Sequence, residues 1–263
     1  MNREKLHCCL VQSDIHPLRV EDNLNRYRLI LESIENDPDI IVFPEMFAYS
    51  FTEDIAQTAV ENEKICLEFL YQISQKYGAD VVASLAVVEK GNLFNRLVWI
   101  REDKIIAKYD KRHLFFGHEK QFCTCGKTKV TANKSGWNFL PLICYDIRFP
   151  NWCRNHYKDG AILYDCLLLI SNFPTSRMKV LKSLLTARAI ENQAYVIAVN
   201  RIGEDAAGHK HCGKSMVINP LGEIIAEAPS NENCLLSVHI ERDVLEKLRK
   251  SFPVYLDWDE NND

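Results

Sequence analysis

The feature that most constrains this sequence is a series of short apolar runs that recurs from one end of the chain to the other. The runs span residues 6–11, 40–43, 81–88, 97–100, 139–144, 167–170, 195–199, 216–218, 224–226 and 235–240. Runs of this kind are typical of strands buried on both faces, because a half-exposed strand would alternate apolar with polar residues. We therefore expect sheets that are covered on both sides by other layers of the protein.

Between these runs, apolar side chains recur at the spacing of a helical stripe. The expected helices carry Leu24, Tyr27, Leu31 and Ile34; Cys66, Phe69, Ile73 and Tyr77; Val180, Leu181, Leu184 and Leu185; and Val244, Leu245 and Leu248. Gly78 is expected to end the second of them. Strands alternate with helices early in the chain and hairpin-like runs follow, which predicts an α/β fold with one large mixed sheet or two sheets. Because no repeat or linker interrupts the pattern, we expect one domain spanning residues 1–263.

Cysteine is the unusual residue in the composition, with 10 among 263 residues. Disulfides, a metal site and reduced thiols are the alternatives. A chain of this length buries a core without crosslinks, and its charged start does not resemble a secretion signal, so disulfides are not expected. The closest pairs, Cys8–Cys9 and Cys123–Cys125, lack the Cys-x-x-Cys spacing usual in zinc sites. The sequence therefore predicts a cytoplasmic protein whose thiols are reduced and mostly packed in the core, with no metal.

Charge and hydropathy argue against two further classes of protein. The formal net charge is -4 and no block of basic residues occurs, which argues against nucleic-acid binding. No apolar run approaches the roughly 18–20 residues that span a membrane. The expected partner is a small molecule bound at the carboxyl ends of the strands, where open α/β sheets hold their ligands.

A carboxylate, Glu45, follows the run 40–43 after Pro44 and has Phe43, Met46 and Phe47 nearby in sequence. Such surroundings raise the pKa of a glutamate and suit it to general-base catalysis. The alternative is a carboxylate that caps the next segment. Position alone leaves both open.

A cluster of charged residues, 108–113, contains Lys111 and leads into Leu114, Phe115 and Phe116. A charged run usually forms a solvated face. The three apolar residues need a core, however, and draw at least one basic residue toward it. Both interpretations stay open for this cluster.

A third candidate, Cys144, is placed where the run 139–144 meets a turn, and Pro150 is positioned to begin a short helix. A nucleophile at such a turn points outward with backbone N–H groups beside it. A free thiol titrates near ~8.5 and needs a base or a cation nearby; the alternative is an inert core cysteine. Glu45 and Lys111 supply both, and the three groups suffice for acyl transfer from an amide.

The motifs around these residues resemble those of the nitrilase superfamily of carbon–nitrogen hydrolases, whose signature is a Glu-Lys-Cys triad. Residues 43–46, 109–115 and 144–150 are similar to the glutamate, lysine and cysteine motifs, and 187–195, 213–215 and 219–223 to the segments that follow. The similarity runs in order from Leu6 to Ile240. It implies an αββα sandwich, a homodimer or higher homo-oligomer joined through helix layers, and no cofactor or metal.

Within the superfamily, residues 171–174 and 199–203 are most similar to the bacterial omega-amidase group related to nitrilase-like protein 2. This implies hydrolysis of the side-chain amide of a small 2-oxo dicarboxylic acid monoamide, 2-oxoglutaramate or 2-oxosuccinamate, through a cysteine acyl-enzyme. A nitrilase, an N-carbamoyl amidohydrolase and an aliphatic amidase use the same triad and stay open as alternatives. Two further alternatives are a hydrolase or transferase that pairs Cys144 with His113, and a non-catalytic interaction scaffold.

The resemblance also implies a role for each catalytic position. Cys144 would be the nucleophile, and Glu45 the general base and then the acid. Lys111 would stabilise the oxyanion with the backbone N–H of Tyr145. The second glutamate of the family falls on Glu119, where it would position Lys111 and the hydrolytic water.

The substrate-binding positions follow in the same way. Arg148 is similar to the family arginine that binds the substrate carboxylate, and the planar guanidinium suits a 2-oxo acid; the alternative is an ion pair with Asp146 or with a distant carboxylate. Tyr145 and Phe173 would line the pocket, although either could be an ordinary core aromatic.

Two segments are harder to interpret. Cys123 and Cys125 follow Glu119 where related sequences often have Phe and Pro, and their distance from the pocket is open. Residues 203–214 contain His209 and His211, which could ligate zinc, but a polar surface loop is the expected structure. If that loop covers the pocket, it could gate access.

Overall fold

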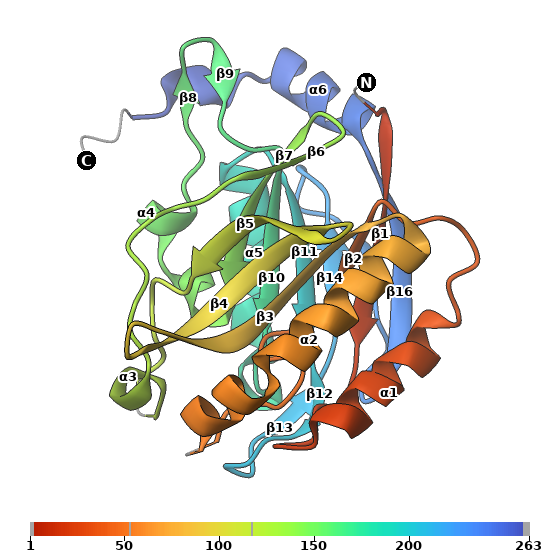
Figure 1. Ribbon diagram of the computed structural model, residues 1–263. Helices are drawn as coiled ribbons and strands as arrows, with labels where there is room; N and C mark the ends of the chain where they lie inside the picture. Colours follow the sequence, from red (N-terminus) through yellow and green to blue (C-terminus); the bar gives the residue numbers. More distant parts are fainter. Residues whose placement is uncertain (1–2, 53, 117, 260–263) are drawn as a thin grey trace.

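Two six-stranded mixed sheets stacked face to face form the centre of the protein (Figure 1). The computed structural model describes residues 3–52, 54–116 and 118–259. The first sheet has the order β16 (Cys234–Glu241), β1 (Lys5–Gln12), β2 (Ile40–Val42), β3 (Asp80–Glu89), β4 (Asn92–Arg101) and β5 (Lys104–Asp110). The second has the order β15 (Ile224–Glu227), β14 (Met216–Ile218), β11 (Tyr195–Asn200), β10 (Cys166–Ser171), β7 (Trp137–Ile143) and β6 (Ala132–Lys134).

Helices cover the outer faces of both sheets and complete the αββα sandwich. Helices α1 (Val20–Leu31) and α2 (Ile55–Tyr77) cover the first sheet, and α5 (Met178–Glu191) covers the second (Figure 1). Helix α6 (Arg242–Ser251) lies at the edge of the molecule where the two termini also lie (Figure 1). The expected αββα fold class is therefore confirmed.

Short helices, 3-10 turns and hairpins lie in the segments that connect these layers. They are α3 (His118–Phe122), α4 (Pro150–Cys153), the 3-10 turns η1 (Cys144–Arg148), η2 (Thr175–Arg177) and η3 (Val254–Asp257), and the hairpins β8 (Tyr157–Lys158) with β9 (Ala161–Ile162) and β12 (Ile202–Glu204) with β13 (Lys210–Cys212). Across the described residues, no helix is both long and apolar enough to cross a membrane.

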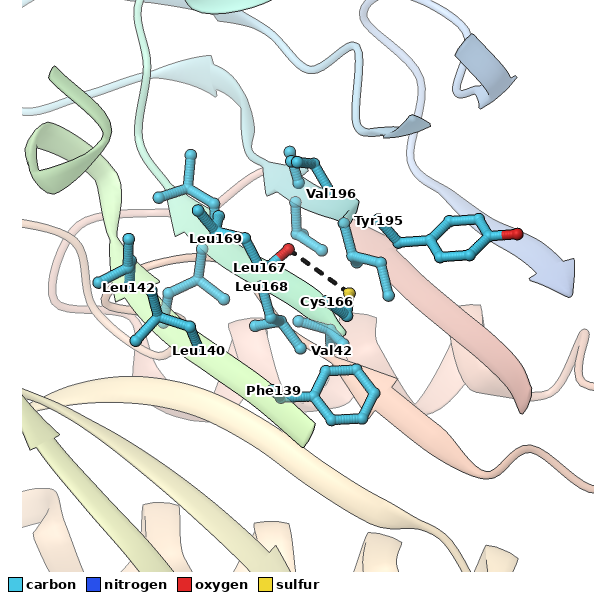
Figure 2. Packing of buried hydrophobic residues seen from close by; sticks show 14 of the residues in the cluster. Val42, Phe139, Leu140, Leu142, Cys166, Leu167, Leu168, Leu169, Tyr195 and Val196 are labelled. Atoms are coloured by element: carbon cyan, nitrogen blue, oxygen red, sulfur yellow. Dashed lines mark hydrogen bonds between the residues drawn. The ribbon is translucent and has the colours of Figure 1, made fainter. Parts of the chain in front are cut away.

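Strand β1 shows why the apolar runs are continuous. Cys8 and Leu10 belong to the core between the two sheets, whereas Cys9 and Val11 pack in the second core with residues of α1 and α2. Successive strand residues point to opposite faces, so a strand with a core on each side is apolar throughout. Figure 2 shows the core between the sheets, where Val42 of β2 lies beside residues of the second sheet.

The ten cysteines are all free and most of them fill the cores. Cys66, Cys153 and Cys166 are fully buried, and burial raises the pKa of Cys66 and of Cys153 to about 12. In Figure 2, the thiol of Cys166 points toward the carbonyl oxygen of Leu167, to which it donates. Cys234, expected in the core, is only half-buried.

Several boundaries differ from the sequence expectation. Strand β7 ends at Ile143, so Cys144 belongs to the turn rather than to the strand. Strand β4 begins at Asn92 instead of residue 97, because polar residues interrupt its apolar pattern. Gly78 ends α2 as predicted, with a left-handed φ of 61°.

Candidate active site

All seven residues that the resemblance assigns to catalysis or substrate binding line one cavity of about 540 Å³. They are Glu45, Lys111, Glu119, Cys144, Tyr145, Arg148 and Phe173. Four strands deliver most of them: β2, β5, β7 and β10 each end shortly before a cavity residue. The carboxyl ends of the strands therefore meet at the cavity, as expected for an α/β sheet.

The nucleophile candidate, Cys144, occupies the first position of η1 and has a φ of 44°. A left-handed φ is unfavourable for a residue with a side chain, and such strain is concentrated at functional sites. The turn is held by the buried carboxylate of Asp146, which accepts hydrogen bonds from the N–H of Ile143 (3.2 Å), the hydroxyl of Tyr109 (2.7 Å) and the N–H of His113 (2.9 Å). The thiol is thus fixed at the cavity by contacts from three parts of the chain.

The ammonium group of Lys111 lies between two carboxylates. Its Nζ donates to Glu45 Oε1 at 2.9 Å and to both oxygens of Glu119 at 2.9 and 2.7 Å. Burial lowers the pKa of Lys111, but the charges of Glu119 and Glu45 outweigh this effect and hold that pKa well above its usual value. Lys111 is therefore a buried cation and not part of a solvated face.

The carboxylate of Glu45 is held at both oxygens. Oε1 also accepts from Asn95 Nδ2 at 2.8 Å, and Oε2 accepts from the backbone N–H of Asn172 at 2.9 Å. Asn95 additionally donates to Glu119 Oε1 at 3.1 Å, so one amide links both carboxylates. Glu45 is thus committed to this cluster and does not serve as a cap for the next segment.

Asn95 and Asn172 are positioning residues that the sequence analysis missed. The available signal for Asn95 was a polar residue inside a strand that is otherwise largely apolar, and such a residue needs a buried partner. Asn172 acts through its backbone, which no side-chain pattern reveals.

The electrostatics of the cavity keep the thiol protonated. Burial raises the pKa of Cys144 well above its usual value, and the charge of Glu45 adds to this effect while Lys111 opposes it. Burial also raises the pKa of Glu119, against the opposing charge of Lys111. A group in the cavity must therefore accept the thiol proton when the sulfur attacks a substrate.

The substrate-side candidates lie on the same cavity. The Arg148 guanidinium is 6.0 Å from the ring centroid of Tyr145. Asp146, its alternative partner, pairs instead with His113, so the ion pair weighed for Arg148 is not formed. The backbone of Phe173 is fixed on both sides by Asn200, which accepts from its N–H at 2.7 Å and donates to its carbonyl at 3.0 Å.

The hairpin β12–β13 also reaches the cavity through residues 205–207, His209 and His211. Oδ2 of Asp205 lies 3.2 Å from His209 Nδ1 and 3.2 Å from His211 Nε2. The prediction of a surface loop is wrong for His211 and Cys212. Both residues belong to β13, pair with β12 and are buried. Among the residues described, no group of three or more His, Cys, Asp or Glu is arranged to hold a metal ion.

His113 contacts residues other than the thiol of Cys144. Its Nδ1 lies 2.9 Å from Asp146 Oδ1, and its ring stacks on Phe149 with centroids 3.7 Å apart. It lines a separate open groove together with Arg112 and Trp152. This geometry gives His113 a structural role and does not favour a Cys–His pair with Cys144.

The two cysteines that follow Glu119 differ in their surroundings. Cys123 lines the cavity, and burial together with the charge of Glu119 raises its pKa to about 12. Cys125 is exposed. Cys123 is therefore close to the candidate site, but as a neutral thiol.

Comparison with known proteins agrees with this geometry. A family model of carbon-nitrogen hydrolases matches residues 9–250. The chain is 36% identical over 255 residues to omega-amidase YafV of Yersinia enterocolitica, covering 97% of each protein. It is 31% identical to a 2-oxoglutaramate amidase of Bacillus subtilis, covering 95% of each.

Solved structures show the same architecture. The chain is similar to a CN-hydrolase superfamily protein from Xanthomonas campestris that carries an arsenic adduct in its active site, with a TM-score of 0.93, 32% identity and 98% coverage of both chains. It also shares its fold with Nit3 of Saccharomyces cerevisiae at a TM-score of 0.79, with 24% identity and 96% coverage of both chains.

Proposed function

Because the chain belongs to the carbon–nitrogen hydrolase family, whose members hydrolyse carbon–nitrogen bonds other than peptide bonds, we propose that it is an omega-amidase. Its substrate would be a small 2-oxo dicarboxylic acid monoamide such as 2-oxoglutaramate or 2-oxosuccinamate. The observation that carries the hydrolytic chemistry is the cation of Lys111 held between two carboxylates in the cavity of Cys144, and the omega-amidase relatives support the substrate class.

In the first half of the reaction, the sulfur of Cys144 attacks the amide carbonyl while Glu45 takes the thiol proton. The negative charge that develops on the carbonyl oxygen is stabilised by Lys111 and by the backbone N–H of Tyr145. Glu45 then returns the proton to the amide nitrogen. Ammonia leaves, and a thioester joins the acyl group to Cys144.

In the second half, a water molecule attacks the thioester and Glu45 accepts one of its protons. Glu119 keeps Lys111 in place and positions the attacking water. Collapse of the second tetrahedral intermediate breaks the carbon–sulfur bond, and the proton returns from Glu45 to the thiol. The dicarboxylate leaves, and Cys144 is again a protonated thiol.

The substrate side of the proposal depends on Arg148. Its guanidinium lies on the cavity of Cys144 and forms no ion pair with the carboxylates of the described residues. A planar guanidinium binds a carboxylate with two parallel hydrogen bonds. Tyr145 and Phe173 would then contact the short carbon chain. The homodimer rests on the resemblance and the cytoplasmic location on the reduced thiols expected from the sequence, and both stay predictions.

A substrate panel tests the proposed reaction. Ammonia release is measured with 2-oxoglutaramate, glutamine, N-carbamoyl-β-alanine and a simple nitrile at equal concentrations. We expect release mainly from 2-oxoglutaramate, because only this compound combines the amide with an anionic 2-oxo acid. Preference for the carbamoyl compound or the nitrile would instead support one of the other carbon–nitrogen hydrolase activities.

A further inference from the structure

A second arginine, Arg177, lies on the cavity and was not singled out from the sequence. It ends η2 and is half-buried, with its guanidinium 4.9 Å from the ring centroid of Phe115. The Phe115 ring meets the Tyr145 ring edge to face at 5.2 Å, and Tyr145 in turn lies 6.0 Å from the Arg148 guanidinium. The two guanidinium groups therefore sit at the two ends of one aromatic pair in the same cavity.

The acidic side chains of the cavity do not neutralise these two arginines. Glu45 and Glu119 hold Lys111, and Asp205 lies beside two histidines. In the part of the chain that the structure describes, neither arginine forms an ion pair. The arginine side of the cavity thus carries two positive charges without an internal counterion.

Such an arrangement favours an anionic ligand. A guanidinium that lies on an aromatic ring is held in place while its N–H groups stay available to a planar acceptor. Partial removal from water strengthens its attraction to a carboxylate. Apolar side chains also line the cavity, among them Phe116, Phe173 and Pro174, which suits a short carbon chain.

We infer that Arg177 is a second substrate-binding residue, which together with Arg148 receives the carboxylate end of the substrate and sets the preference for acyl chains that carry a free carboxylate. This inference rests on the proposed amidase function and names a specificity-determining residue for it. Arg177 takes no part in the proton transfers assigned to Glu45, so its contribution is to binding.

The test compares two amides of the same acyl chain, succinamate and its methyl ester, with the wild-type protein and with Arg177→Met and Arg177→Lys. Loss of a charge-assisted hydrogen bond predicts a fall in kcat/KM for succinamate of about 10- to 100-fold in Arg177→Met, mainly through KM. The kcat/KM for the methyl ester, which has no free carboxylate, should change little. Arg177→Lys keeps the positive charge but not the planar guanidinium, so its kcat/KM for succinamate should lie between those of the wild type and Arg177→Met.

Arg154→Met is the matched control, because the Arg154 guanidinium also lies on an aromatic ring, that of Trp258 at 5.3 Å, and does not line the cavity of Cys144. Its kinetics should equal those of the wild type. If Arg177→Met lowers kcat/KM equally for succinamate and its methyl ester, or lowers it for neither, the inference about Arg177 is wrong while the proposed function stands. If the wild type itself does not prefer succinamate over the ester, the proposed substrate class fails.

Discussion

Replacement of Cys144 with alanine is expected to lower kcat/KM for 2-oxoglutaramate by roughly 10⁴-fold or more, because loss of the nucleophile removes the covalent route. Ammonia release under steady-state conditions measures the effect. The side chain is partly exposed to the cavity, so the variant should keep its thermal stability close to that of the wild type. A measured Tm separates loss of catalysis from loss of folding.

Two other cysteines provide the controls. Cys123→Ala removes a thiol that lines the same cavity, and Cys125→Ala removes an exposed one. Both variants should retain most of the activity. A Cys144→Ala protein that still hydrolyses the amide at a substantial rate, or a Cys123→Ala protein that does not, would assign the nucleophile elsewhere.

Replacement of Lys111 with methionine is the second change with a large expected effect. It removes the proposed oxyanion stabiliser, which by itself is worth about 10²–10³-fold in kcat. It also leaves Glu45 and Glu119 buried without their cation, which should cost about 3–5 kcal/mol of the free energy of unfolding. Steady-state kinetics and urea denaturation measure the two effects separately.

Lys108→Met is the matched control, since Lys108 lies exposed on β5, the strand that ends directly before Lys111. It should change neither activity nor stability.

Two variants test the rival mechanism, in which His113 is the base for Cys144. Glu45→Gln should abolish turnover, whereas His113→Ala should leave much of the turnover. The reverse result would make His113 the base and refute the assignment to Glu45.

The layers of the fold could be predicted because the run 6–11 in β1 is apolar except at His7, with Cys8 facing one core and Cys9 the other. The same reasoning fails along β4 and β5. Arg96 interrupts the apolar pattern of β4, yet it is nearly buried, since it pairs with Asp110 of β5 at 2.6 Å and with Glu89 at 2.7 Å. These partners satisfy its charge inside the sheet, and no local sequence pattern reveals such a pairing.

The candidate site could be predicted where a chemical group lies within a few residues after a strand. Glu45, Lys111 and Cys144 all stand in that position, and the structure brings them to one cavity. Arg177 could not be predicted, because its place depends on a 3-10 turn after β10 and on the ring of Phe115.

Trapping of the acyl-enzyme tests the central claim most directly. The wild-type protein is mixed with 2-oxoglutaramate, quenched in acid within the first turnover, digested and analysed by mass spectrometry. We predict an acyl group in thioester linkage on the peptide that contains Cys144, formed together with the first ammonia released. Ammonia release without an acyl group on Cys144, or with the acyl group on Cys123, would contradict the mechanism.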